Sequence, residues 1–168
     1  MKNLVITDKD ISTELFSNSV VVNLNNIHYC TCTGGLECFK KNGDCYFHDD
    51  MRLISRWMND CQLIIFVTKV KYGCFDIPFK RMLERLIVNF EPFYSIVEGE
   101  SAHQGVSQLK KRLIVIGYGD IDDEEKEIFK DLVEDSSIGF IFTSIHTYFC
   151  CEDELEDTLR TFGGVDHV

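Results

Sequence analysis

The sequence predicts an α/β fold with an open, doubly wound parallel sheet of five strands. Five short runs are apolar almost throughout and rich in β-branched or aromatic residues, which is typical of strands covered by helices on both faces. Segments with helical spacing of apolar residues lie between most of these runs, as parallel connections require. The predicted strands are Leu4–Thr7, Val20–Leu24, Leu63–Thr68, Leu113–Gly117 and Gly139–Thr143.

Four helices are predicted from their start signals and apolar spacing. Asp49-Asp50 precedes the first, and Asp76 precedes the second, which carries Pro78 in its first turn, where a missing N–H is tolerated. The third opens with the carboxylates of residues 122–125, which the helix dipole favours at that end. The fourth spans Glu152 to Phe162. We interpret these carboxylate runs as solvated helix starts rather than as acid–base machinery.

The first crossover is predicted to be short. Only residues 8–19 separate the first two predicted strands, so a first helix has at most two turns. In a flavodoxin-like sheet with the strand order 2-1-3-4-5, ligands bind beyond the carboxyl ends of the strands, at the switch point. The loops of interest are therefore residues 8–13, 68–75 and 117–121.

Composition and charge limit the classes of function. The 168 residues suit a single domain, residues 1–168, that buries its own core. The net charge of −11, from 17 basic and 28 acidic side chains, disfavours binding to nucleic acid or to an anionic membrane surface. The apolar runs fall far short of a membrane-spanning helix, and the first ten residues lack a signal-peptide pattern. A cytoplasmic protein is expected.

Eight cysteines are unusual for a protein of a reducing compartment, and half of them lie between residues 30 and 45. Because structural disulfides are rare there, this group indicates metal-binding or redox-active thiols. Cys61 and Cys74 flank apolar segments and are expected to be small buried hydrophobic residues.

The same region resembles a known family. Residues 32–38 read Cys-Thr-Gly-Gly-Leu-Glu-Cys, and Gly43-Asp44-Cys45 and Asp49-Asp50-Met51 follow. This succession resembles the flavodoxin-like NAD(P)H-dependent FMN reductases and their iron–sulfur flavoprotein branch. The stretch 60–73 is similar to the strand and flavin loop of the same family. The resemblance covers residues 30–90. It implies bound FMN, hydride transfer from NAD(P)H to a quinone, flavin or protein acceptor, and a homodimer or tetramer.

The resemblance also implies where a metal cluster would lie. The family pattern places thiolates at positions 32, 35, 38 and 45, but position 35 is glycine here. Cys30, Cys32, Cys38 and Cys45 are therefore weak candidates, and Cys30 is offset from the missing position. An incomplete thiolate set leaves iron exposed, so no iron–sulfur cluster is expected. A zinc site from the same residues is an alternative.

The resemblance assigns flavin contacts to three sets of residues, and no side chain is expected to act as an acid or base because the flavin carries the chemistry. The first set would bind the phosphate, the second would form the ring pocket, and the third would close it. The sets are Thr7, Ser12 and Thr13; Thr68, Lys69, Val70, Lys71, Tyr72 and Gly73; and Gly117, Tyr118 and Gly119.

A competing hypothesis is a binding or assembly module that kept the sheet and lost FMN. Residues 8–13 contain no glycine and two carboxylates, which would repel phosphate. The two hypotheses differ in one observable: if Asp8 or Asp10 fills the space beyond the first strand, phosphate has no room there. Residues 98–108 are expected to be the loosest stretch, as a lid or a dimer contact.

Overall fold

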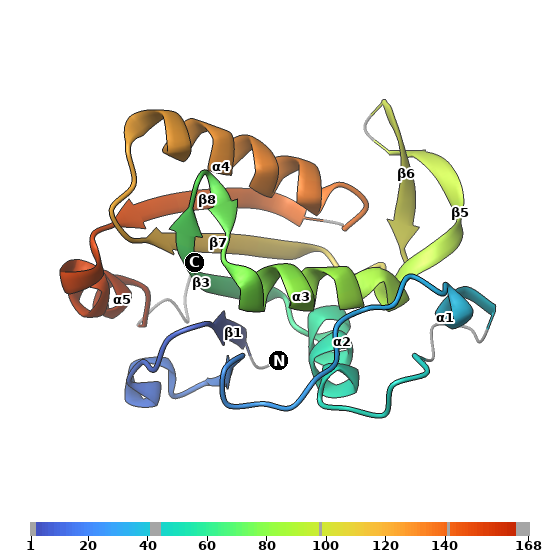
Figure 1. The fold of residues 1–168 in the computed structure, drawn as a ribbon, viewed down its shortest axis with the longest axis horizontal. Helices are drawn as coiled ribbons and strands as arrows, with labels where there is room; N and C mark the ends of the chain where they lie inside the picture. The colour runs from blue at the N-terminus through green and yellow to red at the C-terminus, as the bar shows by residue number, and fades with distance from the viewer. Residues whose placement is uncertain (1–2, 41–44, 98, 141, 164–168) are drawn as a thin grey trace.

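A computed structural model describes residues 3–40, 45–97, 99–140 and 142–163. Its main sheet has five parallel strands in the order β2–β1–β3–β7–β8, which confirms the predicted flavodoxin-like topology (Figure 1). These strands are β1 Asn3–Thr7, β2 Ser19–Asn23, β3 Leu63–Lys71, β7 Lys111–Tyr118 and β8 Phe142–Cys150.

Helices cover both faces of the sheet. One face packs against the longer helices, and the other packs against a single helical turn and the C-terminal helix. The first group is α2 Met51–Asp60, α3 Ile77–Arg85 and α4 Asp123–Ser137, and the second is η1 Thr13–Phe16 and α5 Leu155–Gly163. The remaining short helices are α1 Glu37–Lys40, η2 Leu86–Asn89 and η3 Glu152–Glu154. None of the helices in the described ranges has the length and apolar character that a membrane crossing requires.

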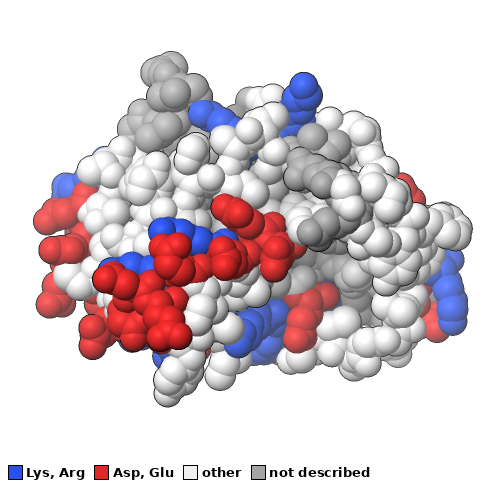
Figure 2. Space-filling view, turned by 90° about the horizontal axis from the view of Figure 1, so that it is seen from above, with Lys and Arg blue, Asp and Glu red and all other residues white. Residues whose placement is uncertain are grey.

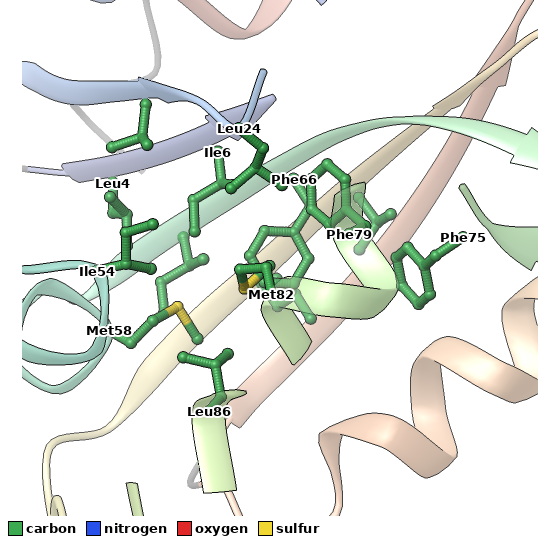
Figure 3. Close-up of a cluster of buried hydrophobic side chains, with 14 of the residues drawn as sticks. Leu4, Ile6, Leu24, Ile54, Met58, Phe66, Phe75, Phe79, Met82 and Leu86 are labelled. Atoms are coloured by element: carbon green, nitrogen blue, oxygen red, sulfur yellow. The ribbon is translucent and has the colours of Figure 1, made fainter. Parts of the chain in front are cut away.

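The alternation of side chains along the central strands divides the core in two. On β1, Leu4 and Ile6 pack toward α2 and α3, whereas Val5 packs on the opposite face with the residues of η1 and α5. Figure 3 shows the larger half, in which Phe66 of β3 meets Phe79 of α3 with ring centroids 5.3 Å apart. Because both faces are buried, these strands are apolar almost throughout, which is why the sequence revealed them.

The fifth strand lies later in the chain than predicted. The apolar run at 139–143 leads into β8, which extends from Phe142 to Cys150 and pairs with β7 alone. As an edge strand it alternates between half-buried and exposed side chains, so Thr, His and Tyr residues interrupt its apolar pattern. The prediction was wrong because it required a continuous apolar run, which an edge strand does not need.

The predicted loop after the third strand is a β-hairpin. Strand β3 continues to Lys71 and turns back into β4, Cys74–Phe75. Tyr72 and Gly73 form the turn with φ values of 54° and 66°, the left-handed conformation that two-residue hairpin turns favour. The loop predicted over 68–75 is therefore reduced to the turn at Tyr72 and Gly73, because hydrogen bonding to β4 extends the strand, and the flavin contacts of Thr68 to Gly73 stay a prediction.

A second hairpin replaces the loose stretch predicted at 98–108. Strand β5, Phe90–Val97, pairs antiparallel with β6, Glu100–Gly105, in a separate two-stranded sheet. Figure 1 shows this hairpin standing beside one end of the main sheet. The prediction of a loose stretch was wrong for the described residues, because hydrogen bonds to β5 order β6, whose polar sequence does not indicate a strand. Its role as a lid or a dimer contact stays a prediction.

Candidate functional site

The carboxyl ends of β1, β3 and β7 meet at the switch point, and the side chain of Asp8 lies there. Asp8 follows β1 directly and is 8% exposed. Its carboxylate accepts hydrogen bonds from the backbone N–H of Lys69 at 2.9 Å, the Thr68 hydroxyl at 3.0 Å and the Tyr118 hydroxyl at 2.8 Å. One carboxylate therefore joins three strands of the sheet.

Burial dominates the electrostatics of this carboxylate. Desolvation raises the pKa of Asp8, although the hydrogen bonds from Lys69, Tyr118 and Thr68 oppose this shift. The pKa of Tyr118 is also raised, first by its burial and then by the charge of Asp8. Tyr118 is therefore held as a neutral donor and does not offer an open aromatic face.

The lysines beside the switch point are paired. Lys9 and Lys69 both contact the carboxylate of Glu152, with N–O distances of 2.8 and 3.0 Å. These contacts, led by the hydrogen bond from Lys9, lower the pKa of Glu152. Sequence reasoning missed Glu152 because it lies in η3, 143 residues from Lys9, and no local pattern signals the contact.

The three residues predicted to bind the flavin phosphate differ in their burial and hydrogen bonds. The Thr7 hydroxyl is fully buried and folds back on Lys9, donating to its carbonyl oxygen and accepting from its N–H. Ser12 and Thr13 are exposed at the start of η1, and the Ser12 side chain makes no cap hydrogen bond there. Phosphate normally binds at the N-terminus of a longer helix, but η1 is a single turn of four residues.

The second carboxylate of the first crossover is also engaged. Asp10 accepts hydrogen bonds from the side-chain amides of Asn23 at 2.6 Å and Asn26 at 3.1 Å. A cavity of about 450 Å³ lies here, between the crossover, the end of β2 and α2. Its walls are largely apolar, with Ile11, Leu53 and Trp57 among them.

The ring-pocket candidates lie along β3, in the turn of its hairpin with β4, and at the end of β7. Tyr72 is 89% exposed at the tip of the β3–β4 hairpin, and Lys71 pairs with Asp76 at 3.0 Å. A Cβ at Gly117 would lie 2.8 Å from Val70, so this glycine serves packing between β7 and β3. Thr68, Lys69 and Val70 lie within the strand, and Gly119 continues from β7 with a φ of 138°.

The residues after β3 and β7 nevertheless border one crevice. Its volume is about 620 Å³, and the β3–β4 hairpin, the turn after β7 and η3 surround it. Its charged lining consists of Lys69, Lys71, Asp120, Glu125, Glu152 and Asp153. The carboxylates outnumber the lysines, so the crevice disfavours an unscreened anion.

The four cysteines at 30–45 lie in the segment between β2 and α2, and Cys45 lines a cavity against α2. Cys38 is buried, and desolvation first, then the nearby Cys45 and Cys32, raise the pKa of its thiol. The backbone N–H of Cys30 is bound by Asp49. No group of three metal-ligating side chains occurs in the part of the chain that the structure describes. The absence of an iron–sulfur cluster stays a prediction.

The arrangement matches proteins of known structure. An FMN-dependent NADH-azoreductase from Bacillus anthracis, solved with FMN, is similar over 97% of this chain and 96% of its own, with a TM-score of 0.63 and 14% identity. An NAD(P)H:quinone oxidoreductase from Methanothermobacter marburgensis is similar over 96% and 91%, with a TM-score of 0.62 and 10% identity. This chain has the flavodoxin-like fold. No protein-family model and no curated protein sequence matches it.

The residues at the switch point do not fit FMN held in the manner of this flavodoxin-like fold. Flavin phosphate requires free backbone N–H groups and a favourable dipole beyond the first strand. Here Asp8 brings a carboxylate to that position and takes the backbone N–H of Lys69. The aromatic residues that could flank the ring are buried, as Tyr118 is, or project into solvent, as Tyr72 does.

Proposed function

We propose that this chain is a flavodoxin-fold binding or assembly module that works without FMN. The observation that carries this proposal is the buried carboxylate of Asp8, which closes the switch point with hydrogen bonds from β3 and β7. A flavin phosphate would bring a second anion beside this carboxylate, and the cost of burying two like charges together is high. In this proposal the chain keeps the flavodoxin-like fold, and the Asp8 carboxylate occupies the position that the flavin phosphate would take.

A second observation indicates what such a module binds. The β5–β6 hairpin exposes large apolar side chains, with Phe93 at 78%, Tyr94 at 71% and Ile96 at 74%. Exposed apolar side chains that cluster on one element are typical of protein interfaces. The partner that we propose is a second copy of this chain, because pairing the exposed Tyr94 and Ile96 of two hairpins would bury apolar surface, although Glu91 and Glu100 also lie on these strands.

Titration with FMN tests the first part of this proposal. Protein purified anaerobically should show no flavin absorbance, and its addition to FMN should leave the flavin fluorescence unchanged. Iron, sulfide and zinc measured on the same sample test the cysteine group. Stoichiometric quenching of FMN fluorescence would contradict the proposal.

An FMN-dependent NAD(P)H oxidoreductase is the second candidate, and the crevice of about 620 Å³ is the observation that favours it. In that function Lys69 and Lys71 would face the flavin from β3, with Gly117 to Gly119 on the other side. The flavin would supply hydride transfer to a small-molecule or protein acceptor. FMN binding in the titration, followed by NAD(P)H oxidation, would establish this function instead.

A further inference from the structure

A second polar cavity lies on the outer side of α2, and it shares no lining residue with the switch point. Its volume is about 270 Å³. Helix α2 forms one wall, and the end of α3, η2 and the segment at Cys45 complete it. The lining residues are Cys45, Met51, Arg52, Ser55, Arg56, Asn59, Asp60, Arg85 and Val88.

Arg85 is the buried cation of this cavity. Its side chain is 2% exposed, and its two terminal nitrogens bind Asp49 at 2.8 and 2.9 Å. Burial disfavours the charge, but the hydrogen bond to Asp49 and the neighbouring Cys45 thiol raise the pKa of Arg85. Its Nε has no hydrogen-bond partner among the described residues. A buried charged group with an unused donor is costly unless a ligand or water completes it.

Two further arginines face the same space. Arg52 and Arg56 lie four residues apart on α2, so they share one side of the helix and repel each other. Arg52 contacts a ring nitrogen of His48 at 2.9 Å. Arg56 forms no ion pair with any residue that the structure describes. Asp49 compensates the charge of Arg85, and Asp60 is the one acidic residue in the lining, so Arg52 and Arg56 leave the cavity positive although the molecule carries −11.

Cys45 places a thiol at the edge of this positive cavity. The residue is half-buried, and its sulfur lies close enough to Arg85 to affect the pKa of the guanidinium. Cys45 is itself one of the residues that line the cavity. A ligand in the cavity would therefore shield Cys45 from reagents in solution.

We propose that this cavity binds the phosphate group of a small ligand through Arg52, Arg56 and the free Nε–H of Arg85. Guanidinium groups present paired donors that match the oxygens of phosphate, and three such groups around a cavity of this size surround one tetrahedral dianion. The Asn59 amide lies on the same wall as a further donor, whereas the Ser55 hydroxyl donates to Oδ1 of Asn89. The site is separate from the switch point and does not depend on whether FMN binds there.

Protection of Cys45 from alkylation tests this site, with inorganic phosphate as the probe. Iodoacetamide alkylates a thiolate: sulfur bonds to the methylene carbon, iodide leaves and the thiol proton passes to solvent. Peptide mass spectrometry then gives the rate at each cysteine. Phosphate at about ten times its dissociation constant should slow the reaction of Cys45 about tenfold. Cys151, exposed beside Glu152 and far from the cavity, is the internal control and should react at an unchanged rate.

Matched variants distinguish a site from general screening. Arg56→Gln should abolish most of the protection by phosphate, whereas Arg160→Gln, which removes an exposed arginine of α5, should leave it intact. Sodium chloride at the same ionic strength should not protect Cys45. Equal protection by chloride, equal protection in Arg56→Gln, or a Cys45 that does not react without phosphate would each overturn the proposal.

Discussion

Asp8 illustrates how a fold changes the environment of one residue. On a solvated loop, a carboxylate after the first strand would keep its hydration. Here it is buried among hydrogen-bond donors from β3 and β7. The donors offset part of the desolvation cost, and the pKa of Asp8 is raised because burial outweighs them. The residue therefore links the stability of the sheet to pH.

We expect Asp8→Asn to remove a pH dependence of stability. Because the pKa of Asp8 is higher in the folded chain than its ordinary value of 3.8, the native state binds more protons than the unfolded state just above that pH. The free energy of unfolding should therefore fall as the pH rises from 3.8 through the raised pKa. Asparagine does not titrate, so urea unfolding of Asp8→Asn should lack this fall.

Asp120→Asn is the control for this measurement. Asp120 lies in the turn after β7, on the same edge of the molecule, but its side chain is exposed. Its replacement should leave the fall in stability in place. A pH profile of Asp8→Asn that matches the unmodified protein would show that the buried carboxylate does not titrate in this range.

At the scale of elements, the β3–β4 hairpin depends on the conformation of its turn and on helix α4. Gly73 has a φ of 66°, and a Cβ there would lie 2.7 Å from Cγ2 of Ile128. Both the backbone and the packing therefore favour glycine at this position. This turn and the strands that it joins take the place of the loop predicted at 68–75.

Gly73→Ala should destabilise the protein more than Gly34→Ala does. Gly34 has a similar φ of 71° but no atom within 4 Å of the added Cβ, so its replacement costs only the backbone penalty of about 1 kcal/mol. Gly73→Ala adds the contact with Ile128 to that penalty. Equal free energies of unfolding for the two variants in urea would show that the helix moves aside without cost.

At the scale of the whole molecule, acidic side chains concentrate in one region and exposed apolar side chains concentrate on the β5–β6 hairpin. Figure 2 shows the view onto α4, in which acidic side chains gather in a broad region with few lysines among them. The β5–β6 hairpin lies at the other end of the sheet (Figure 1), and Tyr94 and Ile96 project from the same side of β5. These apolar side chains favour self-association through the hairpin, although Glu91 and Glu100 also lie on its strands.

We expect the protein to form a dimer that dissociates when Tyr94 and Ile96 are both replaced by serine. Light scattering after gel filtration should give twice the chain mass for the unmodified protein and the chain mass for the double variant. Ile77→Ser is the control, because Ile77 is 67% exposed at the start of α3, away from the hairpin. A monomeric unmodified protein, or a double variant that remains dimeric, would contradict the assignment.

The sequence by itself determined the α/β class, the strand order and the short first crossover. Strands β1, β3 and β7 are buried on both faces, so each is a run of apolar residues that stands out without any knowledge of its neighbours. The limits of β8 and the β5–β6 hairpin were not predictable in this way. The limits of an edge strand or an isolated hairpin depend on hydrogen bonds to a partner strand as well as on its own residues.

The occupation of the switch point was decided by the tertiary structure alone. The acidic character of residues 8–13 was plain, and it raised the possibility that phosphate is excluded. That Asp8 is buried there depends on Thr68, 60 residues away, and on Tyr118, 110 residues away. A carboxylate can stay in solvent and repel an anionic ligand, or it can be buried at the position that the ligand would take. The hydrogen-bond donors that the fold brings to the carboxylate decide between these outcomes, and no local sequence pattern indicates those donors.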